Sequence, residues 1–197
     1  AGVNAGNSIT SGGNYNTVVG DEAGTAITTG DQNTAVGYRA LYTNSTGGNN
    51  VALGTYALDL NTTGDSNTAL GYLALSANTT GTLNVAVGKD SMDSNTTGGS
   101  NTAVGVDALQ SNTTASNNTA VGKDALLANT TGTAGTAMGK GALQSNVNGT
   151  DNTGIGCLAL SATTSGSNNV AVGRSSLQNN TTGHSNVAVG YNAAISV

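Results

Sequence analysis

The sequence contains no proline, no tryptophan and no phenylalanine, and it has one cysteine and one histidine in 197 residues. A single cysteine, Cys157, excludes an intrachain disulfide. No apolar run approaches the roughly 18 residues of a transmembrane helix, so we expect no membrane insertion. Only 8% of the residues are charged, the net charge is −5, and the basic residues are scattered, which argues against nucleic acid and anionic membranes as partners. The five basic residues are Arg39, Lys89, Lys123, Lys140 and Arg174.

One pattern runs through almost the whole chain. The segment Asn33-Thr34-Ala35-Val36-Gly37 returns every 17 residues without insertion, and its glycine recurs throughout. A fixed period of this kind indicates a solenoid or array. Glycine tolerates positive φ, so we expect these residues to form the corner after each strand. The corner glycines are Gly37, Gly54, Gly71, Gly88, Gly105, Gly122, Gly139, Gly156, Gly173 and Gly190, preceded by Gly20.

The repeats divide the chain into three parts. Residues 1–15 form a degenerate first repeat, residues 16–192 follow the strict period, and residues 193–197 are the truncated end of a repeat. The first strict unit has Gly24 and Ile27 where later units have leucine and asparagine, and terminal repeats of solenoids are often atypical. The chain starts inside a repeat, without an initiator methionine or a signal peptide, which indicates a piece of a longer protein.

Each unit predicts a short β-strand. Thr34 and Val36 alternate with Asn33 and Ala35, and period-2 alternation with β-branched residues is typical of strands. Two glycines per unit leave no stretch of about 12 residues for a helix. A second segment around Ala40-Leu41 predicts another strand or an extended bend, and Asn61-Thr62-Thr63-Gly64 predicts a turn. The expected core ladder is Val36, Leu53, Leu70, Val87, Val104, Val121, Met138, Ile155, Val172 and Val189.

A column of asparagines accompanies the strands. Residues one period apart stack in a solenoid, and stacked amides can hydrogen-bond to one another. We expect an asparagine ladder, broken at Gly135, formed by Asn33, Asn50, Asn67, Asn84, Asn101, Asn118, Asn152, Asn169 and Asn186.

The predicted core is thin for a single chain. Three or four modest apolar side chains per turn, at about 1.5–3 kcal/mol each, must offset about 1–2 kcal/mol of backbone entropy for every residue. We therefore expect each chain to bury a further face against copies of itself, as a homotrimer or filament. With about 4.8 Å per turn, about eleven turns would make a rod of roughly 50 Å.

The repeat resembles two known groups of proteins. The N-[T/V]-A-[V/L]-G core resembles the head repeat of trimeric autotransporter adhesins. The longer unit from Asn33 to Gly47 is similar to repeats of bacteriophage tail fibres and related bacterial surface proteins. The resemblance covers residues 16–192 and implies a homotrimeric parallel β-roll. This chain departs from the adhesins in its 17-residue unit and its constant N-T-T-G turn.

No enzymatic or metal site is expected, and no cofactor. A calcium-binding roll would need a G-G-x-G-x-D repeat, and Asp31, Asp65 and Asp151 do not recur in every unit. His184 is the only histidine and lies in a variable turn position, which favours a surface role. The aspartate column of Asp90, Asp107 and Asp124 could flank a glycosidic bond, but nearby lysines favour a solvated face.

Two surface features leave alternatives open. Several N-x-[S/T] sequons could carry glycans: Asn44, Asn61, Asn78, Asn95, Asn112, Asn117, Asn129, Asn148 and Asn180. The repeat itself explains seven of these, which share the turn column; Asn117 and Asn148 lie outside it. Threonine columns at the Thr62-Thr63 turns favour an ice-binding solenoid as the alternative function, although adjacent residues face opposite ways.

The sequence predicts a structural and adhesive segment of an extracellular fibre, on a virion or a bacterial surface, and not an enzyme. Its expected partners are copies of itself and cell-surface glycans. Tyr38 and Tyr72 are the candidate glycan contacts, although packing between subunits is an equal alternative. Any such contacts should be weak singly and act through multivalency.

Overall fold

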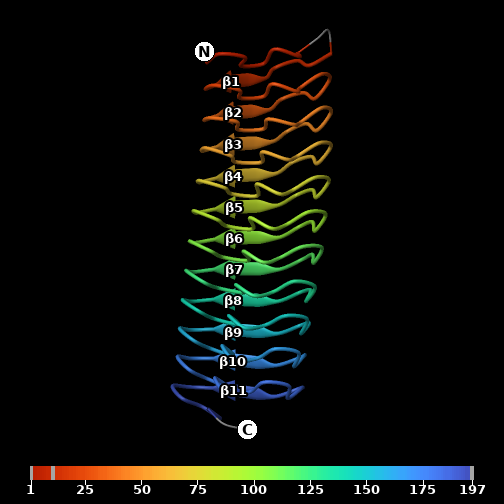
Figure 1. Ribbon diagram of the computed structural model, residues 1–197. Helices are drawn as coiled ribbons and strands as arrows, with labels where there is room; N and C mark the ends of the chain where they lie inside the picture. The colour runs from red at the N-terminus through yellow and green to blue at the C-terminus, as the bar shows by residue number, and fades with distance from the viewer. Residues whose placement is uncertain (1, 10–11, 196–197) are drawn as a thin grey trace.

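The chain folds as a stack of flat turns. The computed structural model describes residues 2–9 and 12–195, so Thr10 and Ser11 of the first repeat and residues 196–197 of the last lie outside the described residues. Eleven short strands form one parallel sheet in chain order, as Figure 1 shows by their vertical stacking. The described residues contain no helix. The predicted parallel β-solenoid is therefore confirmed.

Each strand has three residues and begins directly after the asparagine of its repeat, or after Gly135 in the case of β8. Neighbouring strands pair with an offset of 17 residues, for example Thr34 with Val51 and Thr102 with Thr119. The strands are β1 (Thr17–Val19), β2 (Thr34–Val36), β3 (Val51–Leu53), β4 (Thr68–Leu70), β5 (Val85–Val87), β6 (Thr102–Val104), β7 (Thr119–Val121), β8 (Thr136–Met138), β9 (Thr153–Ile155), β10 (Val170–Val172) and β11 (Val187–Val189).

The central residue of each strand faces the interior, and its two neighbours face outward. Ala35 and Ala103 are fully buried. In the expected core ladder some side chains, such as Val36, are half-buried, and the others are exposed, from 36% at Val104 to 70% at Val189. The prediction that this ladder forms the core is therefore wrong. The alternation of inward and outward residues along the strand is confirmed, but the face predicted to point inward points outward.

The interior is narrow, which explains the choice of face. Leu41 and its equivalents, with Met92 in one turn, are fully buried, and they lie against the inner side of the strands. A methyl group added at Gly154, which stands in the alanine column, would lie 3.3 Å from Leu143 Cγ. Only small residues fit between this leucine column and the sheet.

The first strict turn supports this interpretation. Val18 takes the alanine position in β1, and Gly24 takes the leucine position of the same turn. A methyl group added at Gly24 would lie 2.7 Å from Val18 Cγ1, so the larger strand residue occupies the space that the missing leucine leaves. Ile27 replaces the usual asparagine and is fully buried, with Ile9 packed against the same cluster. The core of this turn is thus more apolar than that of the turns after it.

The segment after each corner is a series of turns, not a second strand. Arg39 and Leu41 have φ of 54° and 52°, and the equivalent leucines repeat this conformation. Left-handed φ costs a non-glycine residue about 1–2 kcal/mol. Contacts between turns hold it, because the N–H of Leu41 donates to Ala57 O at 3.0 Å and that of Arg39 donates to Asp21 O at 3.0 Å.

The ten corner glycines follow the strands directly. Their φ values lie between +126° and +143°, a region that disfavours other residues. A second constraint comes from the stacking, since a Cβ at Gly105 would lie 2.6 Å from the carbonyl oxygen of Gly122 in the next turn. The corner needs glycine for both reasons.

Two asparagine ladders complete the interior. In the expected ladder, the Asn33 side-chain oxygen accepts from the backbone N–H of Asn50 at 3.0 Å, and the Asn50 side chain donates to Gly64 O at 2.8 Å. The same pattern continues through Asn67 and beyond, and at the break in the column Gly135 donates its N–H to Asn118. These amides satisfy backbone groups that a purely apolar core would leave unpaired.

The second ladder lies in the N-T-T-G turns, whose asparagines the sequence suggested only as turn residues. The Asn61 side chain donates to Asn44 Oδ1 at 2.8 Å and to Gly64 O at 3.0 Å. Where Thr163 replaces the asparagine, Asn146 Oδ1 is buried without a hydrogen-bond partner. Members of this ladder are Asn44, Asn61, Asn78, Asn95, Asn112, Asn129 and Asn146.

Candidate functional site

The most extensive candidate surface is the outward side of the sheet, formed by the first and third residues of all eleven strands, here called the outer sheet face. The third residues are the aliphatic side chains of the expected core ladder, preceded by Val19. The first residues are threonine in seven strands and valine in the other four: Thr17, Thr34, Val51, Thr68, Val85, Thr102, Thr119, Thr136, Thr153, Val170 and Val187.

Within the described part of the chain, the outer sheet face is uncovered. The hydroxyls of its threonines, such as Thr102 and Thr119, make no hydrogen bond to any described residue. Parallel sheets are usually covered on both faces, and large exposed apolar surfaces usually mark interaction sites. The outer sheet face therefore has the properties of a binding surface.

The two threonines of each N-T-T-G turn face opposite ways, as the sequence predicts. Thr62 is half-buried, and its hydroxyl donates to Thr79 O of the next turn at 3.0 Å. The following residue, Thr63, is exposed. The N-T-T-G turns thus form one column of exposed threonines. The outer sheet face has two columns side by side, one of threonine or valine and one of aliphatic residues.

A second candidate surface lies beyond the corners of β2 to β4 and is here called the tyrosine patch: Tyr38, Tyr42, Tyr56 and Tyr72 with Arg39, Glu22 and Asp59. The ring of Tyr56 meets that of Tyr38 edge-on at 5.4 Å between centroids and that of Tyr72 at 6.3 Å. Tyr38 and Tyr72, the two tyrosines expected as glycan contacts, are 40% and 47% exposed. They are joined through the ring of Tyr56, a tyrosine that lies near both of them in the repeat.

A charged centre lies beside these rings. The Arg39 guanidinium lies 4.1 Å above the Tyr42 ring, and its Nε lies 3.3 Å from Asp59 Oδ1 and 3.9 Å from Glu22 Oε2. Arg39 Nε and Asp59 Oδ1 are buried and close enough for an ion pair, but their orientation does not make a hydrogen bond. Burial raises the pKa of Asp59, which outweighs the lowering effect of Arg39.

The aspartate column does not form an open carboxylate pair. Lys89 forms an ion pair with Asp90, and Lys123 Nζ lies 2.8 Å from Asp124 Oδ2. The hydrogen bond to Asp90 raises the pKa of Lys89. Among residues 2–9 and 12–195, no group of three or more histidine, cysteine, aspartate or glutamate side chains is arranged to hold a metal ion.

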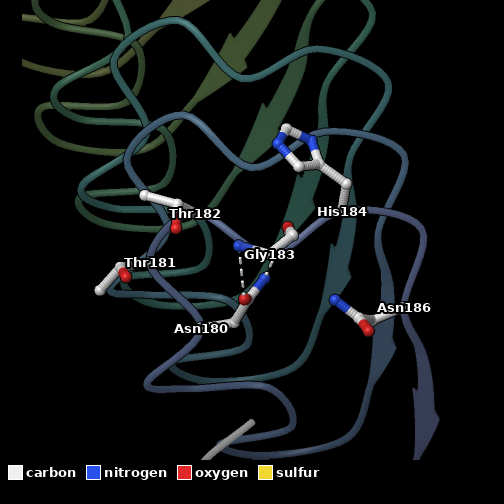
Figure 2. A pocket seen from close by; sticks show the side chains of 6 residues that line it. All are labelled: Asn180, Thr181, Thr182, Gly183, His184 and Asn186. Carbon is white, nitrogen blue, oxygen red and sulfur yellow. Dashed lines mark hydrogen bonds between the residues drawn. The ribbon is translucent and has the colours of Figure 1, made fainter.

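A polar hollow lies at the last N-T-T-G turn (Figure 2), lined by Asn180, Thr181, Thr182, Gly183, His184 and Asn186. The Asn180 amide bonds to Gly183 at 3.2 Å and 3.0 Å, and His184 Nδ1 accepts from the Ser167 N–H at 3.0 Å. In earlier repeats the next turn covers these positions, as Asn61 covers Asn44. The hollow is thus the uncovered surface of a turn, and His184 binds the turn before it.

The sequons separate into two groups. Those in the turn column, such as Asn61 and Asn95, are fully buried within the second ladder and hydrogen-bonded through their amides. Asn117 and Asn148 are exposed. These two present a side-chain amide at the surface of the folded chain.

We compared the chain with known proteins and found no match. No protein-family model, curated protein or solved structure matches the chain. None of the described residues belongs to a helix long and apolar enough to cross a membrane. The class that the fold defines is a parallel β-solenoid with a 17-residue repeat.

Proposed function

We propose that the chain is a rigid structural segment of an extracellular or virion fibre, in which three copies pack through their outer sheet faces. The observation that carries the proposal is the uncovered outer sheet face, which keeps its aliphatic column through all eleven strands without interruption. A surface that continues along the whole rod favours a partner of the same length and period, and a second copy of the chain has both. The likeness of the repeats to fibre proteins supports the extracellular setting.

The internal hydrogen bonding supports the role of a rigid spacer. Backbone groups and both asparagine ladders bond mainly to the next or the preceding turn, so that each repeat is held by its neighbours. A solenoid of this kind can act as a rigid spacer without a ligand-binding or catalytic site. In this proposal the chain is not an enzyme and needs no cofactor.

Light scattering tests the proposal. The native segment should have a mass of about three times 19.0 kDa. Val104→Lys with Val121→Lys adds two charges to the outer sheet face, and we expect it to yield folded monomers. Thr97→Lys with Thr114→Lys adds the same charges to exposed turn positions in two neighbouring repeats, and this control should remain trimeric. A native segment that is monomeric at micromolar concentration contradicts the proposal.

Ice binding is the second candidate function, favoured by the threonine and aliphatic columns of the same outer sheet face. Its side chains repeat at about 4.8 Å between strands and about 6.7 Å along each strand, a flat array that could order water. This candidate requires the face to stay free. It predicts a monomer with thermal hysteresis that the Val104→Lys/Val121→Lys variant loses and the turn variant keeps. A trimer without hysteresis would exclude it.

A further inference from the structure

The tyrosine patch departs from the repeat in a confined region. The chain has six tyrosines, and four of them lie in this patch. The Tyr38 position is taken by Thr55 in the next turn and by Lys89 and Val106 in later ones. A contact that runs along the whole rod would not be built from residues present in only three turns. The patch is therefore better suited to a compact ligand than to a lengthwise subunit interface.

The patch is also held rigidly. Tyr56 donates its backbone N–H to Tyr38 O at 3.0 Å, and Arg39 is fixed between the Tyr42 ring and the carboxylates of Asp59 and Glu22. The side chains directly after Arg39 and Tyr56, Ala40 and Ala57, are fully buried and anchor the segment. Aromatic rings that are already ordered lose little conformational freedom on binding a ligand.

The chemistry of the patch favours a neutral sugar. Exposed tyrosine rings offer apolar faces for the C–H side of a pyranose, with hydroxyls at their edges. The terminal nitrogens of Arg39 donate no hydrogen bond to a described residue, so they can serve as donors for sugar hydroxyls. One arginine against Asp59 and Glu22 leaves a net charge of −1, which disfavours acidic sugars.

We propose that the tyrosine patch is a binding subsite for neutral hexose glycans, with Tyr38 and Tyr72 as stacking rings and Arg39 as hydroxyl donor. The inference goes beyond the structural role proposed above and does not depend on the number of subunits. It extends the two tyrosines expected from the sequence to a site of three linked rings and one oriented arginine.

Affinity electrophoresis in native gels tests the subsite, with dextran and mannan as neutral probes and alginate as the acidic one. The native segment should be retarded by at least one neutral polysaccharide and not by alginate. Tyr38→Ala with Tyr72→Ala should weaken this retardation by about tenfold in apparent affinity, as expected for two lost ring contacts. The matched control, Tyr15→Ala with Tyr191→Ala, removes two exposed tyrosines outside the patch and should keep full retardation.

Three outcomes would overturn the subsite. Retardation by neither neutral polysaccharide, retardation by alginate alone, or equal effects of the two tyrosine pairs would each contradict it. Circular dichroism and light scattering on every variant separate this failure from that of the spacer. If Tyr38→Ala/Tyr72→Ala changes the mass of the assembly while its spectrum is unchanged, the patch is a subunit contact. If the mass is unchanged and binding is lost, the subsite stands whatever the subunit number.

Discussion

Replacing Asn95 with aspartate would test whether the second ladder stabilises the interior. The change keeps the shape of the side chain but removes its two N–H donors. These donate to Asn78 Oδ1 at 2.8 Å and to Gly98 O at 3.1 Å, and Asn95 is fully buried. Gly98 O also accepts from Asn84 Nδ2 at 2.8 Å, so Asn78 Oδ1 is the acceptor that loses its donor. A buried acceptor left without a donor costs about 1–3 kcal/mol, so Asn95→Asp should lower the free energy of unfolding by at least about 1–3 kcal/mol at neutral pH.

The loss of stability in Asn95→Asp should depend on pH, and burial of the new carboxyl group sets the direction of this dependence. A carboxyl group at this position would face two oxygen acceptors, and both burial and these acceptors favour its protonated form. Its pKa in the folded state should therefore exceed its value in the unfolded chain, about 3.9. A protonated carboxyl can donate one hydrogen bond. The variant should thus regain stability as pH falls through the raised pKa and lose it as pH rises.

Urea denaturation followed by circular dichroism measures this effect, and hydrogen exchange shows whether it stays near the substituted turn. Asn117→Asp is the matched control, because Asn117 is exposed and its backbone N–H, not its side chain, bonds to Gly99 O. We expect the control to change the free energy of unfolding by less than about 0.5 kcal/mol. Equal losses for both variants, or a loss at Asn95 that does not vary with pH, would refute the role of the ladder.

Three further perturbations test other parts of the fold. Gly105→Val should lower the melting temperature strongly, because its φ is +140° and the new Cβ would lie 2.6 Å from a carbonyl oxygen of the next turn; an unchanged melting temperature would contradict the corner. In urea denaturation, Leu109→Ala should lower the free energy of unfolding by about 2–5 kcal/mol, because Leu109 is fully buried. Val104→Ala, on the outer sheet face, should lower it by less than about 1 kcal/mol in the monomer, and a larger loss at Val104 than at Leu109 would favour the Val36 column as the core. Because burial raises the pKa of Asp59, its contribution to stability should be fully present below its ordinary value of 3.8 and lost as pH rises through the raised value, a dependence that Asp59→Asn should remove from the stability profile.

The local features of each repeat followed from the sequence. The period of 17, the strand after each asparagine and the glycine at each corner are properties of residues close in the chain, and they reflect intrinsic backbone preference. Stacking of Asn33 on Asn50 also followed, since any structure that keeps the period places these residues one above the other. The tyrosine patch was visible only in part, because Tyr56 and Arg39 join Tyr38 and Tyr72 through side-chain contacts between turns.

The direction of the faces was decided by the tertiary structure. Alternation of Thr34, Ala35 and Val36 separates two sides of a strand but does not say which side is inside. The sequence favours the larger residues of the Val36 column as the core, because burial of large apolar groups is the usual source of stability. In this fold the leucine column and two asparagine ladders already fill the space within each turn, and a Cβ at Gly154 would lie only 3.3 Å from Leu143. The volume left beside the sheet admits a methyl group, so alanine is buried and valine faces outward.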